Sequence, residues 1–193
     1  MRAVDGFSLI EMLVVLFVVV LMTSLVSLNL DSGAGQRELR ERLDTLMAVA
    51  GYALDEAQFS GSDFGALFVA ETDDRGESRV AVYWRQRLPE GWRQPLNSQD
   101  IFEPLRFPAG ARVQLLLEGD EVLPAGATAS DPLGGATPQW LLVSSGETQP
   151  GELLLRSRDA DALEWRLSWD ALARFEQYRG TDQESLEDYA LAR

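Results

Sequence analysis

The chain has 193 residues, a formal charge of -14, no cysteine and no histidine, and arginine supplies all 17 of its basic side chains. Those absences exclude disulfides, catalysis by cysteine or histidine, lysine Schiff bases and phosphate-loop lysines. The negative charge opposes binding to nucleic acid or to anionic lipid surfaces, so no nucleic-acid partner is expected. The length suits one globular domain with an additional anchoring segment.

The N-terminal part holds a long apolar run, residues 12–30, that contains no charged side chain. A helix of that length rises about 28 Å, close to the hydrocarbon thickness of a bilayer. Its leucines, valines and Phe17 give an insertion free energy of about -4 to -8 kcal/mol. The run is too long for an ordinary cleaved secretory signal, although residues 32–34 offer signal peptidase a small-residue site as an alternative. The sequence predicts a transmembrane helix over residues 7–30.

A short motif precedes this run: residues 6–11 read GFSLIE. They closely resemble the class III signal of type IV pilins and pseudopilins. The resemblance implies that a membrane aspartyl peptidase, the prepilin peptidase, removes the leader 1–6 by cutting between Gly6 and Phe7, and methylates the new amine of Phe7. It also implies that Glu11 pairs with the terminal amine of a neighbouring subunit. A lone carboxylate near the bilayer is costly and needs such a partner, unless Glu11 reaches the headgroups instead.

A second, amphipathic helix is predicted after a break at residues 32–35, where the letters SGAG supply two glycines. Apolar residues then recur at helical spacing: Leu39, Leu43, Leu46, Met47, Ala50 and Leu54. This stripe needs a surface to cover, and in pilins the corresponding half-helix lies against a sheet. A coiled-coil partner helix is the alternative, although the stripe is shorter than the several heptads that such pairing requires. Residues 31–59 are therefore interpreted as linker and amphipathic half-helix.

From Phe64 onward, short strand-like runs separated by turn residues predict antiparallel β structure. Residues 65–71 and 79–85 flank a turn at residues 73–76 and predict a hairpin. Further strands are predicted at residues 112–117 and 139–145, joined by a long loop rich in proline, glycine and alanine at residues 124–138.

Residues 164–170 show the clearest alternation and predict a strand with Trp165, Leu167 and Trp169 on a buried face and charges on the other face. An aromatic stripe of this kind could also bind carbohydrate, but regular alternation favours a core. Just before it, Asp159 and Asp161 lack the further oxygen ligands of a calcium site and are interpreted as a turn. No metal site, cofactor or catalytic residue is predicted.

The segment 142–150, with the letters LVSSGETQP, and the leucines at 153–155 resemble the C-terminal signature of the H-type minor pseudopilins and their FimT-like relatives. Gln149 departs from the tighter turn expected there, which implies a local loop difference. The resemblance implies an α+β, type IV pilin-like fold, in which a long N-terminal helix packs on an antiparallel β-sandwich of two sheets. The β-rich domain is expected at residues 60–178, followed by a tail at 179–193. A capping box at residues 181–184 favours a short helix there, and a disordered terminus is the alternative.

The resemblance implies a structural subunit near the tip of a type II secretion pseudopilus, in contact with the other minor pseudopilins of the tip and the major pseudopilin. It would cross the bacterial inner membrane once, with its C-terminal domain in the periplasm. The arginine count alone favours the opposite orientation, but the peptidase acts on the cytoplasmic side. A FimT-like or FimU-like minor pilin of a type IV pilus is the first alternative. A membrane-anchored periplasmic hydrolase using paired carboxylates is the second, although the spacing of 31 acidic residues selects no pair.

Overall fold

The structure is a computed structural model that describes residues 9–72, 75–97, 100–126, 135–158 and 165–180, with the backbone alone at residues 23–34. The leader, the acidic turn before residue 165 and residues 181–193 of the C-terminal tail therefore lie outside the described residues. The chain divides into two compact units, Met1–Arg37 and Glu38–Arg193.

Helix α1 (Leu9–Ser60) is continuous, so the predicted break at residues 32–35 is wrong. A glycine inside a helix costs only about 0.8–1.0 kcal/mol relative to alanine, and the leucine, arginine and glutamate residues that follow are good helix formers. Gly35 accordingly has no left-handed φ angle, whereas Gly61 has a φ of 67°. The N–H of Gly61 donates to the carbonyl of Ala57 at 2.9 Å. Glycine therefore ends this helix where it takes the left-handed conformation of a C-cap, and not where it occurs mid-helix.

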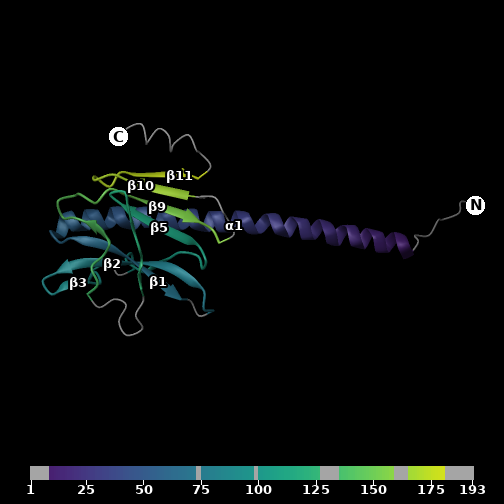
Figure 1. The fold of residues 1–193 in the computed structure, drawn as a ribbon, viewed down its shortest axis with the longest axis horizontal. Coiled ribbons are helices and arrows are strands. Elements are labelled where there is room, and N and C mark those ends of the chain that lie inside the picture. Colours follow the sequence, from purple (N-terminus) through teal and green to yellow (C-terminus); the bar gives the residue numbers. More distant parts are fainter. Residues whose placement is uncertain (1–8, 73–74, 98–99, 127–134, 159–164, 181–193) are drawn as a thin grey trace, which may run out of the picture. The chain divides into compact units, whose positions relative to one another are not determined.

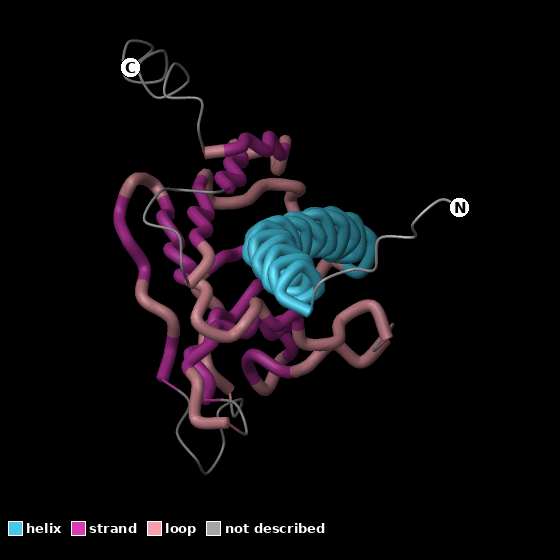
Figure 2. Tube along the Cα trace, turned by 90° about the vertical axis from the view of Figure 1, so that its right-hand side faces the viewer, coloured by secondary structure: helices cyan, strands magenta, loops and turns pink. Residues whose placement is uncertain are grey.

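The described strands form two sheets (Figures 1 and 2), and the larger is built on one long hairpin. Its strands are β1 (Phe64–Thr72), β2 (Ser78–Leu88), β3 (Gly91–Arg93), β4 (Leu105–Arg106), β7 (Ala125–Gly126) and β8 (Trp140–Leu142). The predicted hairpin is confirmed, because β1 and β2 pair antiparallel from Phe64 opposite Gln86 to Thr72 opposite Ser78.

The second edge of β1 differs from the prediction, because β7 lies inside the predicted loop 124–138 and pairs parallel with β1. Next to it, β8 pairs antiparallel with the start of β1. The side chain of Gln139 lies between the two: its Oε1 accepts from the N–H of Phe68 at 2.8 Å, and its Nε2 donates to the carbonyl of Phe68 at 3.0 Å. An amide side chain thus takes the place of strand backbone at this edge.

The smaller sheet has the order β11-β10-β9-β5-β6, and all its pairs are antiparallel. Its strands are β5 (Arg112–Leu117), β6 (Asp120–Val122), β9 (Gly151–Arg156), β10 (Trp165–Trp169) and β11 (Phe175–Arg179). The strand predicted at 112–117 is confirmed with the same bounds, and the strand predicted at 164–170 is confirmed as β10. The strand predicted at 139–145 is confirmed only over β8, because the residues after Leu142 form a turn.

The second face of β10 carries a charge, as predicted, but it is covered: Arg166 and Ser168, between the apolar positions, are each 8% exposed. Alternation shows that a strand has two faces but not whether the second one is covered. Here the neighbouring strand supplies Glu152, whose Oε1 accepts from Nη2 of Arg166 at 2.6 Å. A buried charge tolerates such a site only when it is paired, as it is here.

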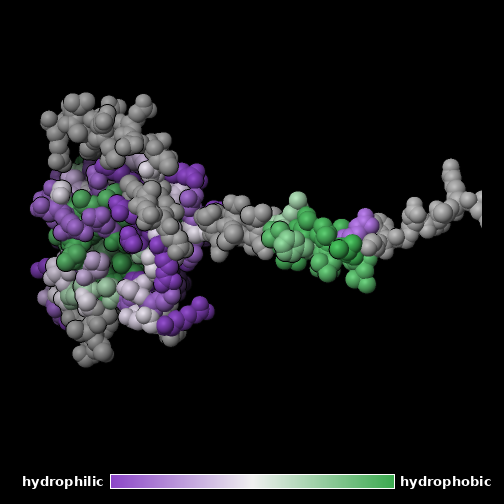
Figure 3. Space-filling view, turned by 45° about the vertical axis from the view of Figure 1, so that its right-hand side comes forward, coloured by the Kyte–Doolittle hydropathy of each residue, from purple (hydrophilic) through white to green (hydrophobic). Residues whose placement is uncertain are grey.

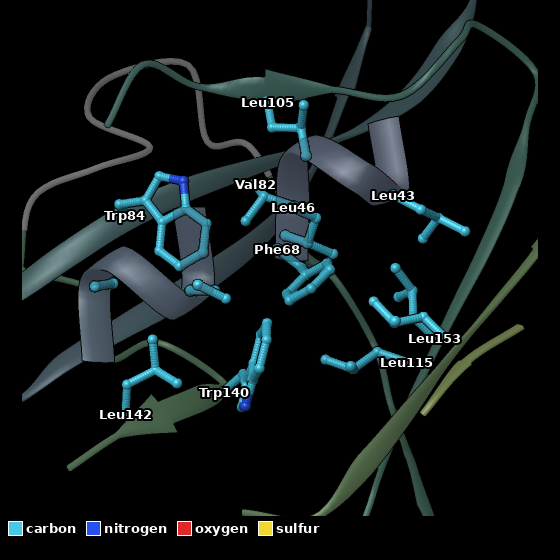
Figure 4. Packing of buried hydrophobic residues seen from close by; sticks show 14 of the residues in the cluster. Leu43, Leu46, Phe68, Val82, Trp84, Leu105, Leu115, Trp140, Leu142 and Leu153 are labelled. Atoms are coloured by element: carbon cyan, nitrogen blue, oxygen red, sulfur yellow. The ribbon is translucent and has the colours of Figure 1, made fainter. Parts of the chain in front are cut away.

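One hydrophobic core joins the C-terminal part of α1 to both sheets (Figure 4). The predicted stripe is confirmed, because Leu39, Leu43, Leu46 and Ala50 are at most 1% exposed and Leu54 is 8% exposed. From the sheets the cluster receives large side chains on inward positions, among them Phe68, Val82, Trp84, Leu115, Trp140 and Leu153. The described domain is therefore α+β, as predicted, with the helix stripe packed in the core.

Candidate assembly surface

The N-terminal segment of α1, residues 9–22, presents apolar side chains on every side of the helix. Thirteen large apolar residues in it are between 43% (Val18) and 85% (Leu9) exposed. Figure 3 shows this stretch of α1 mostly in green. A helix that is apolar all round is normally surrounded by protein or lipid, because each such side chain gains about 1.5–3 kcal/mol on burial. This segment therefore requires surroundings that residues 9–22 do not provide for themselves.

Glu11 carries the one charge within residues 9–22 and lies in the first described turn of α1, with its side chain exposed. The predicted cleavage residues Gly6 and Phe7 lie outside the described residues, so the structure does not bring them together with Glu11. The predicted transmembrane helix 7–30 falls partly outside as well. Among the residues that the structure describes, none forms a helix both long and apolar enough to cross a membrane.

The predicted signature segment 142–150 forms a compact turn between β8 and β9. The N–H of Val143 donates to the carbonyl of Glu147 at 2.8 Å, and that of Gly146 donates to the carbonyl of Val143 at 2.9 Å. Gly146 has a φ of 91°, a conformation that side chains with a Cβ rarely adopt. Gln149, which departs from the family pattern, contributes to this turn through its backbone: its carbonyl accepts a hydrogen bond from Nε1 of Trp169 at 2.7 Å.

Thr148 is the centre of this segment and is 5% exposed. Its Oγ1 accepts from Nε1 of Trp140 at 2.7 Å and donates to the carbonyl of Leu141 at 2.7 Å. Its N–H donates to the carbonyl of Ala171 at 2.9 Å. The hydroxyl thus satisfies an indole that is fully buried, and the backbone ties this turn to the turn between β10 and β11.

Aromatic rings extend the same connection from one sheet to the other. The ring centroids of Trp140 in β8 and Trp169 in β10 are 4.3 Å apart, and Phe175 in β11 packs edge-on to Trp140 at 6.1 Å. The signature segment therefore joins the two sheets. We interpret Thr148 and the backbone of this segment as structural, since their polar groups form internal hydrogen bonds.

A carboxylate in the larger sheet binds three neighbouring side chains. Glu71 in β1 accepts a short hydrogen bond from the hydroxyl of Tyr83, and Nε atoms of Arg79 and Arg106 lie 3.4 and 3.5 Å from its Oε2. Burial raises the pKa of Tyr83 above its ordinary value, and the hydrogen bond to Glu71 raises it further. The arrangement holds β1, β2 and β4 together.

At the end of the smaller sheet, Asp170 and Arg174 form an ion pair on the surface that is shorter than the arginine contacts of Glu71. Asp170 accepts from Nε of Arg174 at 2.6 Å and from the N–H groups of Leu172 and Arg174, each at 3.0 Å. These bonds, first among them the one from the Arg174 side chain, lower the pKa of Asp170, and the same pair raises the pKa of Arg174. Among the described residues, no three acidic side chains gather in a way that could hold a metal ion.

Sequence reasoning missed the Trp140–Thr148 pair and the Glu71 group, because the fold of a turn brings the first two side chains together and strand register brings the second group together. The signal available for the first was a tryptophan followed by a threonine across a predicted turn. Nothing in the residue pattern singled out Glu71 from the other acidic residues.

No family model matches this chain. The type II secretion system protein H of Pseudomonas aeruginosa is 27% identical to it over 172 residues, which cover 88% of this chain and 93% of that protein. The minor pseudopilin EpsH from the type 2 secretion system of Vibrio cholerae has a similar solved structure, with a TM-score of 0.56, 18% identity, and coverage of 76% of this chain and 99% of that one. The solution structure of E. coli GspH gives a TM-score of 0.54 at 16% identity, over 77% and 92% of the two chains.

The two solved structures establish the fold, and the Pseudomonas protein extends the similarity along most of the sequence. The resemblance predicted from the motifs at residues 6–11 and 142–150 is thereby confirmed: this chain is similar, over most of its length, to the H-type minor pseudopilins of type II secretion systems.

Proposed function

We propose that this chain is a minor pseudopilin, a structural subunit of a type II secretion pseudopilus that helps export folded proteins across the outer membrane. The observation that carries the proposal is the match to protein H along 88% of the chain. It is supported by a helix segment whose apolar side chains are exposed on all sides. No catalysis is proposed, because the similar proteins are fibre subunits.

For maturation, we propose cleavage between Gly6 and Phe7 by the prepilin peptidase and methylation of the new Phe7 amine. The GFSLIE motif at residues 6–11 supports this. The mature helix would then begin four residues before Glu11. A negative side chain and a positive terminal amine compensate each other where neither is well solvated, which favours a fixed stagger between neighbouring subunits.

For location and assembly, we propose that residues 7–30 cross the inner membrane and enter the fibre core, with the β-rich domain in the periplasm as a two-sheet sandwich. The partners would be the major pseudopilin and the other minor pseudopilins near the tip. The exposed apolar surface of residues 9–22 supports this, since lipid and neighbouring apolar helices are both suitable surroundings for it.

Mass spectrometry of the N-terminus tests the processing step. The native protein should begin at Phe7 with a methylated amine, and Gly6→Ala should leave the leader attached. A native chain that begins at Met1, or that begins after Ala34 and diffuses freely, would contradict the proposal.

Deletion of the gene tests the function. Export of folded proteins to the medium should fall, while twitching motility should stay normal. Intact secretion with lost twitching would instead identify a FimT-like pilin. If the chain turns over a periplasmic substrate, and replacing one pair of carboxylates abolishes that turnover, the chain is a hydrolase.

A further inference from the structure

The outer face of the smaller sheet carries two arginines directly opposite each other. Arg112 in β5 and Arg156 in β9 are Cα partners in the antiparallel register. Their neighbours Val113 and Leu155 belong to the hydrophobic core, so the two guanidinium groups share the opposite face. Like charges directly opposite on a sheet are destabilising. The pair therefore works against the stability of the isolated domain.

The two arginines border a recess of about 390 Å³. It is lined by Arg112, Val113, Gln114, Glu121, Leu154 and Arg156. The recess thus combines two cationic groups, an amide that can donate or accept hydrogen bonds, and apolar surface from a leucine. Its one carboxylate, Glu121, is not within ion-pair distance of either arginine.

Other arginines nearby are paired. Nη2 of Arg166 lies 2.6 Å from Oε1 of Glu152, and Nη1 of Arg158 lies 2.9 Å from Oε1 of Glu77. Within the part of the chain that the structure describes, Arg112 and Arg156 have no ion pair, and the buried Nε of Arg156 has no hydrogen-bond partner. The two arginines thus leave adjacent positive charge on the surface of a chain that has 31 acidic and 17 basic residues. Their charge is available to a ligand.

We propose that this recess binds a carboxylate side chain, glutamate or aspartate, on the periplasmic domain of a neighbouring subunit of another kind. The inference rests on the proposed function, which supplies such a neighbour. Guanidinium groups bind carboxylates through two parallel hydrogen bonds, and two arginines bring enough donors to enclose one carboxylate. Leu154 and Gln114 then contact the methylene groups and backbone of the partner.

A single acidic side chain fits better than a polyanion. The net charge of -14 repels nucleic acid and anionic lipid surfaces, whereas one carboxylate meets the local positive potential of the recess. A docked carboxylate also removes the repulsion between Arg112 and Arg156. The pair would thus lower the stability of the free subunit and raise its affinity for the neighbour.

The test uses the full chain in secreting cells, with a photo-crosslinking amino acid at Gln114. The parent chain should form a product with another pseudopilin, identified by mass spectrometry. Arg112→Gln with Arg156→Gln should reduce that product about tenfold, and raising NaCl from about 0.05 to 1 M in isolated membranes should weaken it, because salt shortens the screening length. The matched control is Arg75→Gln with Arg87→Gln. These substitutions remove the same charge from two exposed arginines around the β1–β2 hairpin.

A thermal unfolding measurement separates binding from a structural role. Removing both charges should leave the melting temperature unchanged or raise it, because repulsion is lost. A melting temperature lowered by several degrees, an undiminished crosslink, or a product containing lipid or a second copy of this chain would each overturn the inference. A second photo-crosslinking probe at Leu13 separates the two proposals. Crosslinks at Leu13 without any at Gln114 refute this inference alone. The absence of crosslinks at both positions, together with normal secretion in the deletion strain, refutes the proposed function.

Discussion

Two segments of the same helix use apolar residues in opposite ways. In residues 9–22 the large apolar side chains surround the helix and are at least 43% exposed, whereas in residues 39–57 they form one stripe, of which Leu39, Leu43 and Leu46 are at most 1% exposed. The stripe alternates with charged residues because its partner surface belongs to the same chain. The uniform segment has no polar face, so its partner surface must come from outside the segment. Periodicity thus indicates internal packing, and its loss indicates an external partner.

The two segments should therefore respond differently to substitution. Changes in the stripe should alter the free energy of unfolding of the β-rich domain. Changes in residues 9–22 should leave that free energy unchanged and alter assembly. All five tryptophans follow residue 80, so their fluorescence reports on the domain alone.

The largest expected effect belongs to Glu11→Ala. Removing one partner of a poorly solvated ion pair costs about 3–5 kcal/mol, so incorporation into fibres should fall by roughly a hundredfold to a few thousandfold. Crosslinking to partner pseudopilins in membranes measures this. The control Glu41→Ala removes an exposed carboxylate from the same helix and should have little effect. Unchanged crosslinking of the Glu11 variant, with the subunit still in the membrane, would show that the carboxylate only reaches the headgroups.

A matched pair of leucines tests the contrast within α1 directly. Leu46→Ala empties a site that is 0% exposed and should lower the free energy of unfolding by about 2–5 kcal/mol. Leu13→Ala makes the same change at a position that is 63% exposed and should change it by less than about 0.5 kcal/mol. Denaturant titration of the full chain in detergent, followed by tryptophan fluorescence, measures both. Equal losses would mean that the N-terminal segment helps stabilise the domain.

Thr148→Val tests the connection between the sheets and should have a smaller effect. The substitution keeps the shape but leaves the buried indole N–H of Trp140 without its acceptor, at a cost of about 1–3 kcal/mol. Thr45→Val is the control, because that hydroxyl donates to the carbonyl of Glu41 on the exposed face of α1. If both variants unfold at the denaturant concentration of the parent chain, the signature segment does not stabilise the domain.

Much of the fold could be predicted from the sequence wherever one residue pattern decided the outcome. The helical stripe, the long hairpin and the strand at 112–117 each depend on local periodicity and turn residues, and each is present. Strands of two or three residues, such as β4 and β7, were missed, because so short a run carries no period. The predicted helix break failed for a related reason: two glycines weaken a helix but do not end it.

The candidate site divides in the same way. Glu11 could be selected as a candidate from the sequence, because a single charge beside an apolar run is visible in the order of residues alone. The unpaired arginines Arg112 and Arg156 could not, because they are 44 positions apart and only the register of β5 with β9 brings them together. Likewise, the sequence placed Arg166 on the charged face of its strand but did not reveal its partner, since Glu152 belongs to a different strand. Local pattern predicts elements, whereas sites depend on pairing between elements.

The smallest expected effect concerns Asp170, whose exposed pair with Arg174 offers the weakest test of what stabilises the domain. Its pKa in the folded protein lies below the ordinary value near 3.8, mainly because of the hydrogen bond from Arg174. The unfolded chain then binds the proton more tightly, so the contribution of this carboxylate is present above about pH 4 and is lost as the pH falls through the folded pKa. Asp170→Asn should therefore flatten the decline in stability between about pH 5 and 2, measured by thermal unfolding at several pH values. Asp44→Asn, which removes a carboxylate 3.9 Å from Arg40 on α1, should leave that decline parallel to the parent chain, and an identical effect of the two variants would show that the turn after β10 adds nothing beyond an ordinary surface pair.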